Sequence, residues 1–167
     1  MADPDDHLVI SRVLDASRAR VWSAWTESAR FAKWWGSKPF TLRVVKLDLK
    51  PGGICHYVMQ APDGGDIWAR FTYREAGPPE RLVFTSSFAD AGGEVAPNPW
   101  IADWPAKVLN FVTLIEEDGK TRLTLRATPL DASDLERTTF FKMRSGMQHG
   151  LNGAFDQLAA YLAAGAD

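Results

Sequence analysis

The sequence predicts an α+β protein in which a curved antiparallel sheet of about six to seven strands wraps around a long C-terminal helix. Three observations lead to this prediction. Short segments of strand-like composition follow one another along most of the chain, and turn sequences rich in glycine and proline join them. Two short helical patterns come directly after the first strand. One long amphipathic pattern closes the chain and is the only large cover available for the sheet.

The N-terminal part predicts one strand followed by two short helices. Residues 8–14, Leu-Val-Ile-Ser-Arg-Val-Leu, are rich in the β-branched side chains that strands favour. Ser17 is suited to cap the first helix, because its hydroxyl can accept a hydrogen bond from a free N–H of the first turn. Thr26 or Ser28 starts the second helix, which carries two adjacent tryptophans and ends at Gly36.

Six further strands follow. Their predicted ranges are 41–49, 54–60, 68–75, 81–88, 107–116 and 121–128. The dipeptide Asp118-Gly119 between the last two is a strong signal for a tight hairpin turn. Phe71 and Tyr73 alternate with polar neighbours, which is typical of a sheet with one buried and one wet face. The short turns between successive strands favour antiparallel pairing.

The stretch 89–105 interrupts this pattern. It contains Gly92-Gly93, three prolines and the tryptophans Trp100 and Trp104. It is too long and too rich in proline for a plain hairpin loop, and long loops in compact domains are usually functional or disordered. Because the two tryptophans argue against disorder, we interpret the stretch as a lid or a docking loop.

The last part of the chain predicts one long helix that ends near Gly165. Ser133 and Glu136 form the pattern of a capping box, in which each side chain satisfies a backbone N–H of the other residue. An apolar stripe follows at steps of three and four residues, as expected for one face of a helix. Its members are Phe140, Met143, Met147, Leu151, Ala154, Leu158 and Leu162.

Three glycines, Gly146, Gly150 and Gly153, fall along one edge of this stripe. Each glycine inside a helix costs roughly 1 kcal/mol relative to alanine, so three on one flank indicate a close neighbour or a space left open. Two interpretations follow. The helix either packs tightly on the sheet as a core element or forms the roof of a ligand cavity.

Length and composition restrict the possible functions. The 167 residues, 46% hydrophobic and 24% charged, predict a single soluble domain over 1–167, with 1–6 flexible. A net charge of −2 without a basic run gives no reason to expect nucleic acid, and no apolar stretch is long enough to span a membrane. One cysteine and an acidic start without a signal-peptide pattern indicate a cytoplasmic protein. A homodimer is compatible with these data.

The sequence offers no pattern for covalent or metal chemistry. Cys55 and His56 are adjacent in a predicted strand, so their side chains point to opposite faces and cannot readily act as a pair. One cysteine and three scattered histidines have no metal-ligand spacing, so we expect no catalytic residue, no metal and no cofactor. Glu75 shares its predicted face with Phe71 and Tyr73, and a slip of one residue in that strand would turn it outward.

The inward-facing side chains are candidates for a small-molecule site, because they combine apolar walls with a few polar points. Asn110 shares its predicted face with Val112 and Leu114, so it could place a polar group in a cavity or satisfy a neighbouring backbone group. The candidate ligand-binding residues are Trp34, Trp35, Trp68, Phe71, Tyr73, Phe84, Ser86, Trp100, Asn110, Met143, Met147 and Gly150.

Several motifs along the chain resemble those of one family. Residues 16–36 contain Val-Trp, Ala-Trp-Thr and Trp-Trp-Gly, residues 48–53 read Asp-Leu-Lys-Pro-Gly-Gly, and residues 79–85 read Pro-Glu-Arg-Leu-Val-Phe-Thr. Residues 119–125 and 150–162 continue the same pattern in the same order. Together they resemble homologues of the activator of the heat-shock protein 90 ATPase, within the START-like (birch-pollen-allergen-like) superfamily. The resemblance covers nearly the whole chain.

The resemblance implies the helix-grip fold of that superfamily and a hydrophobic cavity, but no particular substrate. Only the C-terminal domain of the eukaryotic activator is similar to this chain. The N-terminal domain that contacts the chaperone has no counterpart here, which argues against chaperone activation. Leu151 stands where many relatives carry tryptophan, and the smaller side chain would enlarge the cavity near Gly150.

Three functions are compatible with the sequence. The first is a protein that binds a small hydrophobic or aromatic molecule between the sheet and the terminal helix. The second is an interaction module, for which the family suggests a chaperone partner. The third is an enzyme of the cyclase, aromatase or hydrolase kind, which would need an ionisable group with a shifted pKa inside the cavity.

Overall fold

The computed structural model describes residues 8–36 and 39–165, and in this part of the chain seven strands form one antiparallel sheet. The strands are β1 (Leu8–Leu14), β2 (Thr41–Leu47), β3 (Ile54–Gln60), β4 (Asp66–Gly77), β5 (Arg81–Phe88), β6 (Val108–Glu117) and β7 (Lys120–Pro129). Their order in the sheet is β1-β7-β6-β5-β4-β3-β2, so only β1 and β7 pair across a long stretch of sequence. The predicted antiparallel sheet is confirmed.

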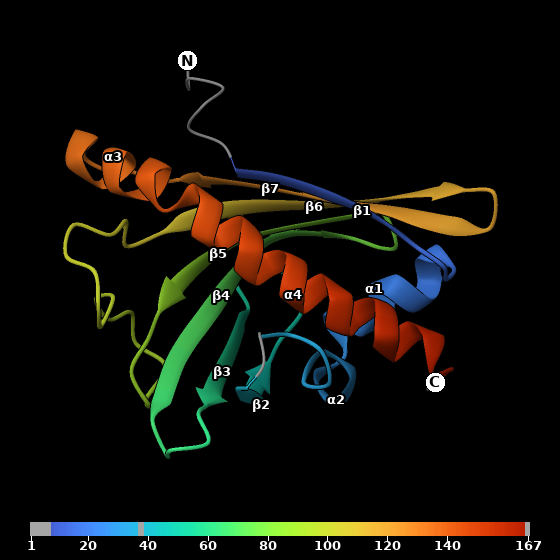
Figure 1. The fold of residues 1–167 in the computed structure, drawn as a ribbon, viewed down its shortest axis with the longest axis horizontal. Coiled ribbons are helices and arrows are strands. Elements are labelled where there is room, and N and C mark those ends of the chain that lie inside the picture. Colours follow the sequence, from blue (N-terminus) through green and yellow to red (C-terminus); the bar gives the residue numbers. More distant parts are fainter. Residues whose placement is uncertain (1–7, 37–38, 166–167) are drawn as a thin grey trace.

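Helices pack on the concave side of this sheet. They are α1 (Arg18–Thr26), α2 (Ser28–Phe31), α3 (Asp134–Lys142) and α4 (Arg144–Ala163). Ser17 caps α1, because its hydroxyl accepts a hydrogen bond from the Arg20 N–H at 3.3 Å. Ser133 and Glu136 form the predicted capping box at the start of α3. Figure 1 shows α4 crossing the sheet, with α1 and α2 near its C-terminal end.

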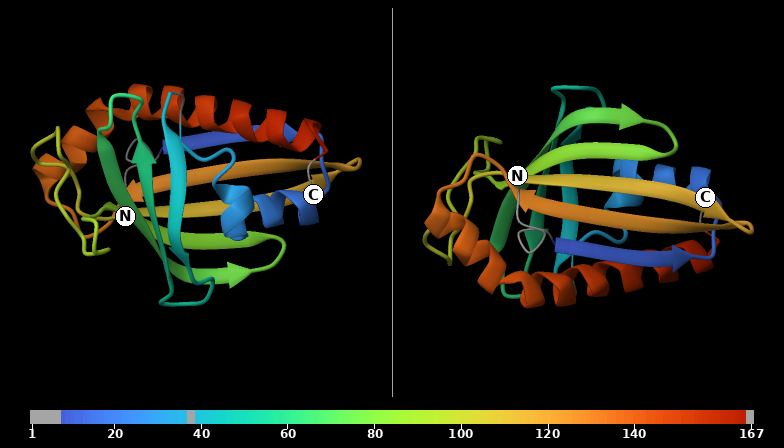
Figure 2. Two further views of the ribbon diagram at one scale, coloured as in Figure 1. Left: turned by 90° about the horizontal axis from the view of Figure 1, so that it is seen from below. Right: turned by 90° about the horizontal axis from the view of Figure 1, so that it is seen from above.

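The prediction of one uninterrupted C-terminal helix is wrong, because the helix breaks at Met143. This residue has φ −91° and ψ 0°, and it ends α3 and precedes α4. The break redirects the chain, so that α3 and α4 together follow the curved sheet (Figure 2). Phe140 is buried and packs on Trp104, with ring centroids 5.6 Å apart. Met143 is 40% exposed, so it does not belong to the buried apolar face that the sequence predicts for it. Packing against the sheet overrides the regular spacing of the sequence.

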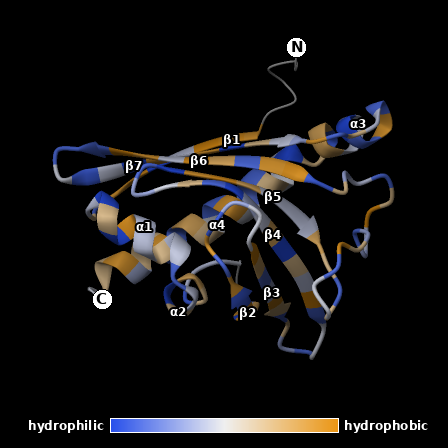
Figure 3. Cartoon of the chain, turned by 180° about the vertical axis from the view of Figure 1, so that it is seen from behind, coloured by the Kyte–Doolittle hydropathy of each residue, from blue (hydrophilic) through white to orange (hydrophobic). Residues whose placement is uncertain are grey.

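Changes of register accompany the curvature of the sheet. The pairing of β4 with β5 shifts between Tyr73 and Glu75, and a similar shift occurs between β2 and β3. Such irregularities bend a strand and increase its twist. The β6–β7 hairpin turns at Asp118-Gly119, both with positive φ, as the sequence predicts. Along β4 hydrophobic and hydrophilic residues alternate, so one face of the strand is available for the core (Figure 3).

The core contains a compact aromatic cluster around Trp25. The ring centroids of Phe31, Trp34, Trp35, Phe84 and Phe155 lie 4.8–6.4 Å from that of Trp25. These rings come from α1, α2 and the turn that follows it, β5 and α4, so the cluster joins the short helices to both the sheet and the long helix. Aromatic pairs contribute beyond the area that they bury, by about 0.5–1.5 kcal/mol each.

Polar contacts anchor the C-terminal half of α4. Arg12 of β1 forms an ion pair with Asp156 at 2.9 Å. The side-chain amide of Gln157 donates hydrogen bonds to the carbonyl oxygens of Trp34 and Gly36. These contacts tie the helix to one edge of the sheet and to the segment after α2, so they fix the position of α4 above the concave face.

Candidate functional site

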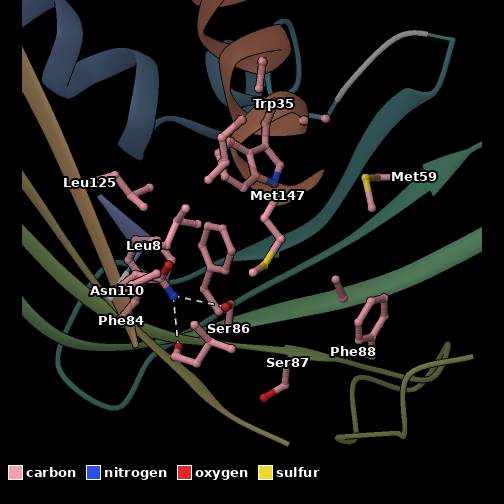
Figure 4. A pocket seen from close by; sticks show the side chains of 18 of the residues that line it. Leu8, Trp35, Met59, Phe84, Ser86, Ser87, Phe88, Asn110, Leu125 and Met147 are labelled. Carbon is pink, nitrogen blue, oxygen red and sulfur yellow. Dashed lines mark hydrogen bonds between the residues drawn. The ribbon is translucent and has the colours of Figure 1, made fainter. Parts of the chain in front are cut away.

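A cavity of about 320 Å³ lies between the concave face of the sheet and the helices α3 and α4 (Figure 4). Its volume is near the lower end of the range that is typical of small-molecule sites, so it suits a compact ligand. The lining residues are Leu8, Trp35, Gly36, Tyr57, Met59, Ala69, Phe71, Phe84, Ser86, Ser87, Phe88, Trp104, Val108, Asn110, Leu125, Ala127, Phe140, Met147, Gly150, Leu151 and Ala154.

The structure places seven of the twelve candidate residues on the cavity wall. They are Trp35, Phe71, Phe84, Ser86, Asn110, Met147 and Gly150. The other five, Trp34, Trp68, Tyr73, Trp100 and Met143, do not line it. Whether the lining residues touch a ligand stays a prediction.

Aromatic rings of the sheet form one wall of the cavity. Phe71 of β4 and Phe84 of β5 are stacked, with ring centroids 4.1 Å apart and an interplanar angle of 27°. Both side chains are almost fully buried, and the alternation of these strands turns them toward α4. Met147 and Leu151 of α4 are partly buried and face them from the other side. The walls are therefore apolar on both sides.

Asn110 of β6 brings a polar group into this apolar wall. Its Nδ2 donates to Ser86 Oγ at 3.0 Å and to the Val108 carbonyl oxygen at 2.9 Å (Figure 4). Both alternatives that the sequence leaves open are thus realised, because the side chain lines the cavity and also satisfies a backbone group. Only 7% of Asn110 is exposed, so these hydrogen bonds form away from bulk water and hold the amide in one orientation.

A second polar pair joins Trp35 to Tyr57. The Trp35 Nε1–H donates to the Tyr57 hydroxyl oxygen at 3.1 Å, and both residues line the cavity. Burial raises the pKa of Tyr57, against the smaller opposing effect of the Trp35 hydrogen bond. The phenol therefore keeps its proton at neutral pH.

Trp34 and Tyr73 belong to the core behind the cavity wall. Trp34 is 1% exposed, and its Nε1–H donates to the Ala24 carbonyl oxygen at 2.9 Å. Tyr73 is also buried and is hydrogen-bonded to Cys55. Burial raises the pKa of the Cys55 thiol to about 12, with the Tyr73 hydrogen bond opposing the shift. The thiol is therefore neutral and enclosed, as a structural cysteine is.

Trp68 lies on the opposite face of the sheet, because it is an odd number of positions from Phe71 along β4. There its ring lies 5.2 Å from the His56 ring, and the Arg43 guanidinium lies 5.8 Å from its centroid. The stretch 89–96 covers this cluster, and His56 Nε2 lies 3.1 Å from the Asp90 carbonyl oxygen. The predicted separation of Cys55 and His56 onto opposite faces agrees with these contacts.

Trp100 and Met143 are exposed residues outside the cavity lining. Trp100 is 66% exposed and contacts Phe88 edge-on, with ring centroids 6.1 Å apart. The tryptophan of the same loop that lines the cavity is Trp104, which also packs on Phe140 of α3. The loop 89–105 therefore contributes to the site, but through its second tryptophan.

Several lining residues are absent from the candidates drawn from the sequence. Tyr57 and Met59 are inward positions of β3, which a strict alternation from buried Cys55 would identify. Phe88 continues the inward face of β5 that the sequence assigns to Phe84 and Ser86. Trp104 carries no local signal that distinguishes it from Trp100, because both lie in a loop without periodicity.

The cavity lining contains no carboxylate, imidazole, amine, guanidinium or thiol group among the described residues. Glu75 does not face inward: the register shift after Tyr73 turns it outward, where it pairs with Arg81 at 3.0 Å. Within 8–36 and 39–165, no three His, Cys, Asp or Glu side chains gather as they would around a metal ion. The cavity can therefore recognise a ligand by its shape and by hydrogen bonds. Among the described lining residues, the ionisable group is the Tyr57 phenol.

Comparison with known families decides the affiliation of the chain. The family model described as Activator of Hsp90 ATPase homolog 1-like protein matches residues 15–163. The chain belongs to this family. The match spans the elements from the first helix cap to the end of α4 and agrees with the motifs quoted above. A comparison with curated proteins finds no match.

Solved structures share the fold over nearly the full chain. Protein Ms6760 from Mycobacterium smegmatis is 29% identical, with a TM-score of 0.78 and coverage of 97% of this chain and 94% of that one. A protein from Arthrobacter aurescens is 25% identical, with a TM-score of 0.80 and coverage of 98% and 90%. DynU16, a protein of the dynemicin biosynthetic locus, is 21% identical with a TM-score of 0.67; 97% of this chain covers 49% of that one.

These likenesses confirm the helix-grip fold for this member of the Hsp90-ATPase-activator-like family, in which a curved antiparallel sheet holds a long C-terminal helix. In the described part of the chain, no helix is both long enough and apolar enough to cross a membrane.

Proposed function

We propose that this protein binds a small, largely apolar molecule in the cavity between its sheet and α4, and that it does so in the cytoplasm without covalent chemistry. The observation that carries the proposal is the cavity itself, about 320 Å³ in volume with walls of stacked aromatic and aliphatic side chains. A space of this size inside a close-packed protein costs stability unless something fills it. Binding of an apolar ligand is the simplest use for it.

The composition of the wall favours binding over catalysis. Acid–base or nucleophilic catalysis needs a group that gains or loses a proton near the working pH. The Tyr57 pKa lies above its ordinary value, and Asn110 and the two serines of the wall are neutral. Tyr57, Asn110 and Ser86 can orient a ligand by hydrogen bonds.

Filling the cavity tests the proposal. Leu151 lines the cavity from α4, so Leu151→Trp places additional volume in the ligand space. A bound apolar probe such as naphthalene should raise the melting temperature of the natural protein, because a ligand at about 100 times its Kd stabilises by about 2.7 kcal/mol. In the Leu151→Trp variant we expect about fivefold to hundredfold weaker binding, since a ligand forced in beside the added ring would cost about 1–3 kcal/mol.

Leu135→Trp is the matched control, because Leu135 lies on α3, is 58% exposed and does not line the cavity. It should leave the affinity for naphthalene unchanged. Equal affinities in all three proteins, or no binding to the natural one, would contradict the proposal. Native mass spectrometry of freshly purified protein would show any small molecule that copurifies.

A second candidate function is docking of a protein partner, in keeping with the family description. Trp100 in the loop 89–105 and Phe141 on α3 are large apolar side chains that are 66% and 40% exposed. Such residues are frequent anchors of interfaces. A change in the ATP turnover of an Hsp90 chaperone on addition of the protein, lost in a Trp100→Ser variant, would favour this function over ligand binding alone.

A further inference from the structure

The orientation of the Asn110 amide is fixed by its neighbours. The Val108 carbonyl oxygen can only accept a hydrogen bond, so the Asn110 atom that lies 2.9 Å from it must be the nitrogen Nδ2. The second hydrogen of Nδ2 is donated to Ser86 Oγ at 3.0 Å. Both amide hydrogens are therefore used inside the protein, and the amide nitrogen has none left for a ligand.

The amide oxygen of Asn110 is left for a ligand. Among the described residues, Oδ1 has no hydrogen-bond partner. It also keeps some open surface, unlike Trp25 Nε1 and Arg70 Nε, which are enclosed without a partner. Because Asn110 lines the cavity, this oxygen offers an acceptor to whatever occupies the space (Figure 4).

Ser86 offers the complementary donor. Its Oγ accepts the hydrogen bond from Asn110, and its own hydroxyl hydrogen has no acceptor among the described residues. Ser87, its neighbour on the cavity wall, differs in this respect, because its hydroxyl donates to the Ala106 carbonyl oxygen at 2.6 Å. Only the first of the two serines is free to donate to a ligand.

We infer that the cavity selects an uncharged ring compound with a hydroxyl group, a phenol being the simplest case, which donates to Asn110 Oδ1 and accepts from the Ser86 hydroxyl. Oδ1 and Nδ2 share one carbon atom, and Nδ2 is 3.0 Å from Ser86 Oγ. One ligand oxygen can therefore lie within hydrogen-bond distance of both groups. This inference rests on the proposed function and names the ligand class of the same site.

The chemistry of the wall disfavours charged ligands. A carboxylate has no hydrogen to give to Oδ1, and none of the described lining residues carries a positive charge that would offset its desolvation. An ammonium group would find no carboxylate partner, because none of the described lining residues carries a negative charge. The aromatic walls formed by Phe71 and Phe84 suit a flat ring, which can stack or lie edge-on against them.

A matched series of naphthalene compounds tests the inference by isothermal titration calorimetry at neutral pH. Naphthol can donate and accept, methoxynaphthalene can only accept, naphthalene can do neither, and naphthoate is charged. In the natural protein we expect naphthol to bind about tenfold more tightly than naphthalene, with methoxynaphthalene between them and naphthoate weakest. Ser86→Ala and Asn110→Leu should each reduce this preference for naphthol severalfold.

Ser11→Ala is the control and should leave the preference unchanged, because Ser11 is exposed, lies outside the cavity lining and has its hydroxyl paired with that of Thr124. Asn110→Leu also loses a bond to the backbone, so Ser86→Ala decides the matter if the Asn110 variant does not fold. Equal binding of naphthol and naphthalene by the natural protein, or a preference that Ser86→Ala leaves undiminished, overturns the inference and leaves the proposed function standing. Failure of every probe to bind the natural protein overturns both.

Discussion

Two glycines of this chain differ in the space around them. A Cβ atom at Gly53 would overlap the carbonyl oxygen of Asp48, and the Gly53 backbone is itself engaged, since its carbonyl oxygen accepts from the Tyr73 N–H at 2.9 Å. Around Gly146, on the exposed side of α4, no atom outside the helix backbone lies within 4 Å of the same position. The first glycine is required by a close approach of the backbone, and the second is not.

Alanine substitution should therefore have opposite effects at these two positions. Gly53→Ala should lower the free energy of unfolding by about 2 kcal/mol or more, because the turn between β2 and β3 must deform to relieve the overlap with the Asp48 carbonyl oxygen. Gly146→Ala should raise it by about 0.5–1 kcal/mol, because alanine loses less entropy in a helix. Urea unfolding followed by tryptophan fluorescence measures both changes. A Gly53→Ala protein as stable as the natural one would contradict the overlap.

Individual residues of the site differ in whether the sequence alone could predict their positions. Asn110 follows from strand alternation, because Val112 and Leu114 define the buried face. Trp34 and Trp35 could not be separated in advance, since both are apolar and follow a helix of only four residues. Their roles depend on which carbonyl or hydroxyl each indole N–H reaches, and that is decided by tertiary packing.

Two parts of the fold differ most from what the sequence pattern predicts. They are the loop 89–105 and the C-terminal helix, which is divided into α3 and α4. The spacing of three and four continues through Met143 without a glycine or proline, so nothing local predicts the break there. The break places Phe140 against Trp104 and thereby joins the loop to the helices at the cavity. The curvature of the sheet, a property of all seven strands together, determines where the helix must turn.

This contact predicts different roles for the two tryptophans of the loop. Trp104→Ala removes a lining ring and its packing on Phe140, so naphthol should dissociate at least about tenfold faster, since interface changes act mainly on dissociation rates. Trp100→Ala, at a position 66% exposed and outside the lining, should leave the rate close to that of the natural protein. Stopped-flow fluorescence measures both rates. Equal acceleration in the two variants would argue against a specific role for Trp104.

For the molecule as a whole, the antiparallel character of the sheet follows from the sequence. Turn signals between successive segments predict antiparallel neighbours from β2 to β5 and for β6 with β7, and one wet face predicts a helical cover on the other. The pairing of β1 with β7 and the volume of the cavity could not be predicted in the same way. Both depend on how strongly the sheet curves, which arises from register shifts such as that between Tyr73 and Glu75.

Global stability should fall in alkaline solution, because the core holds protonated groups that the unfolded chain would release. The Cys55 thiol has an ordinary pKa of 9.0 and a pKa of about 12 in the folded protein. Burial also raises the pKa values of Tyr57 and Tyr73. Above pH 9.0 the folded state binds more protons than the unfolded state, so a rise in pH favours unfolding.

The contribution of Cys55 is thus complete below pH 9.0 and is lost as the pH approaches about 12. The free energy of unfolding should decrease by up to about 1.4 kcal/mol per pH unit for each such group. Urea unfolding at several pH values in this window measures the slope. Cys55→Ser, which does not titrate there, should give a shallower slope. A stability independent of pH across the window would show that these groups are not enclosed.

The anchoring of α4 is uneven along its length. Asp156 and Gln157, which tie it to β1 and to the segment after α2, both belong to its C-terminal half. The N-terminal half, with Met147 and Leu151, spans the cavity. Asp156 and Gln157 do not line the cavity, so substitutions at these two residues would weaken the attachment of α4 without altering the surface that meets a ligand.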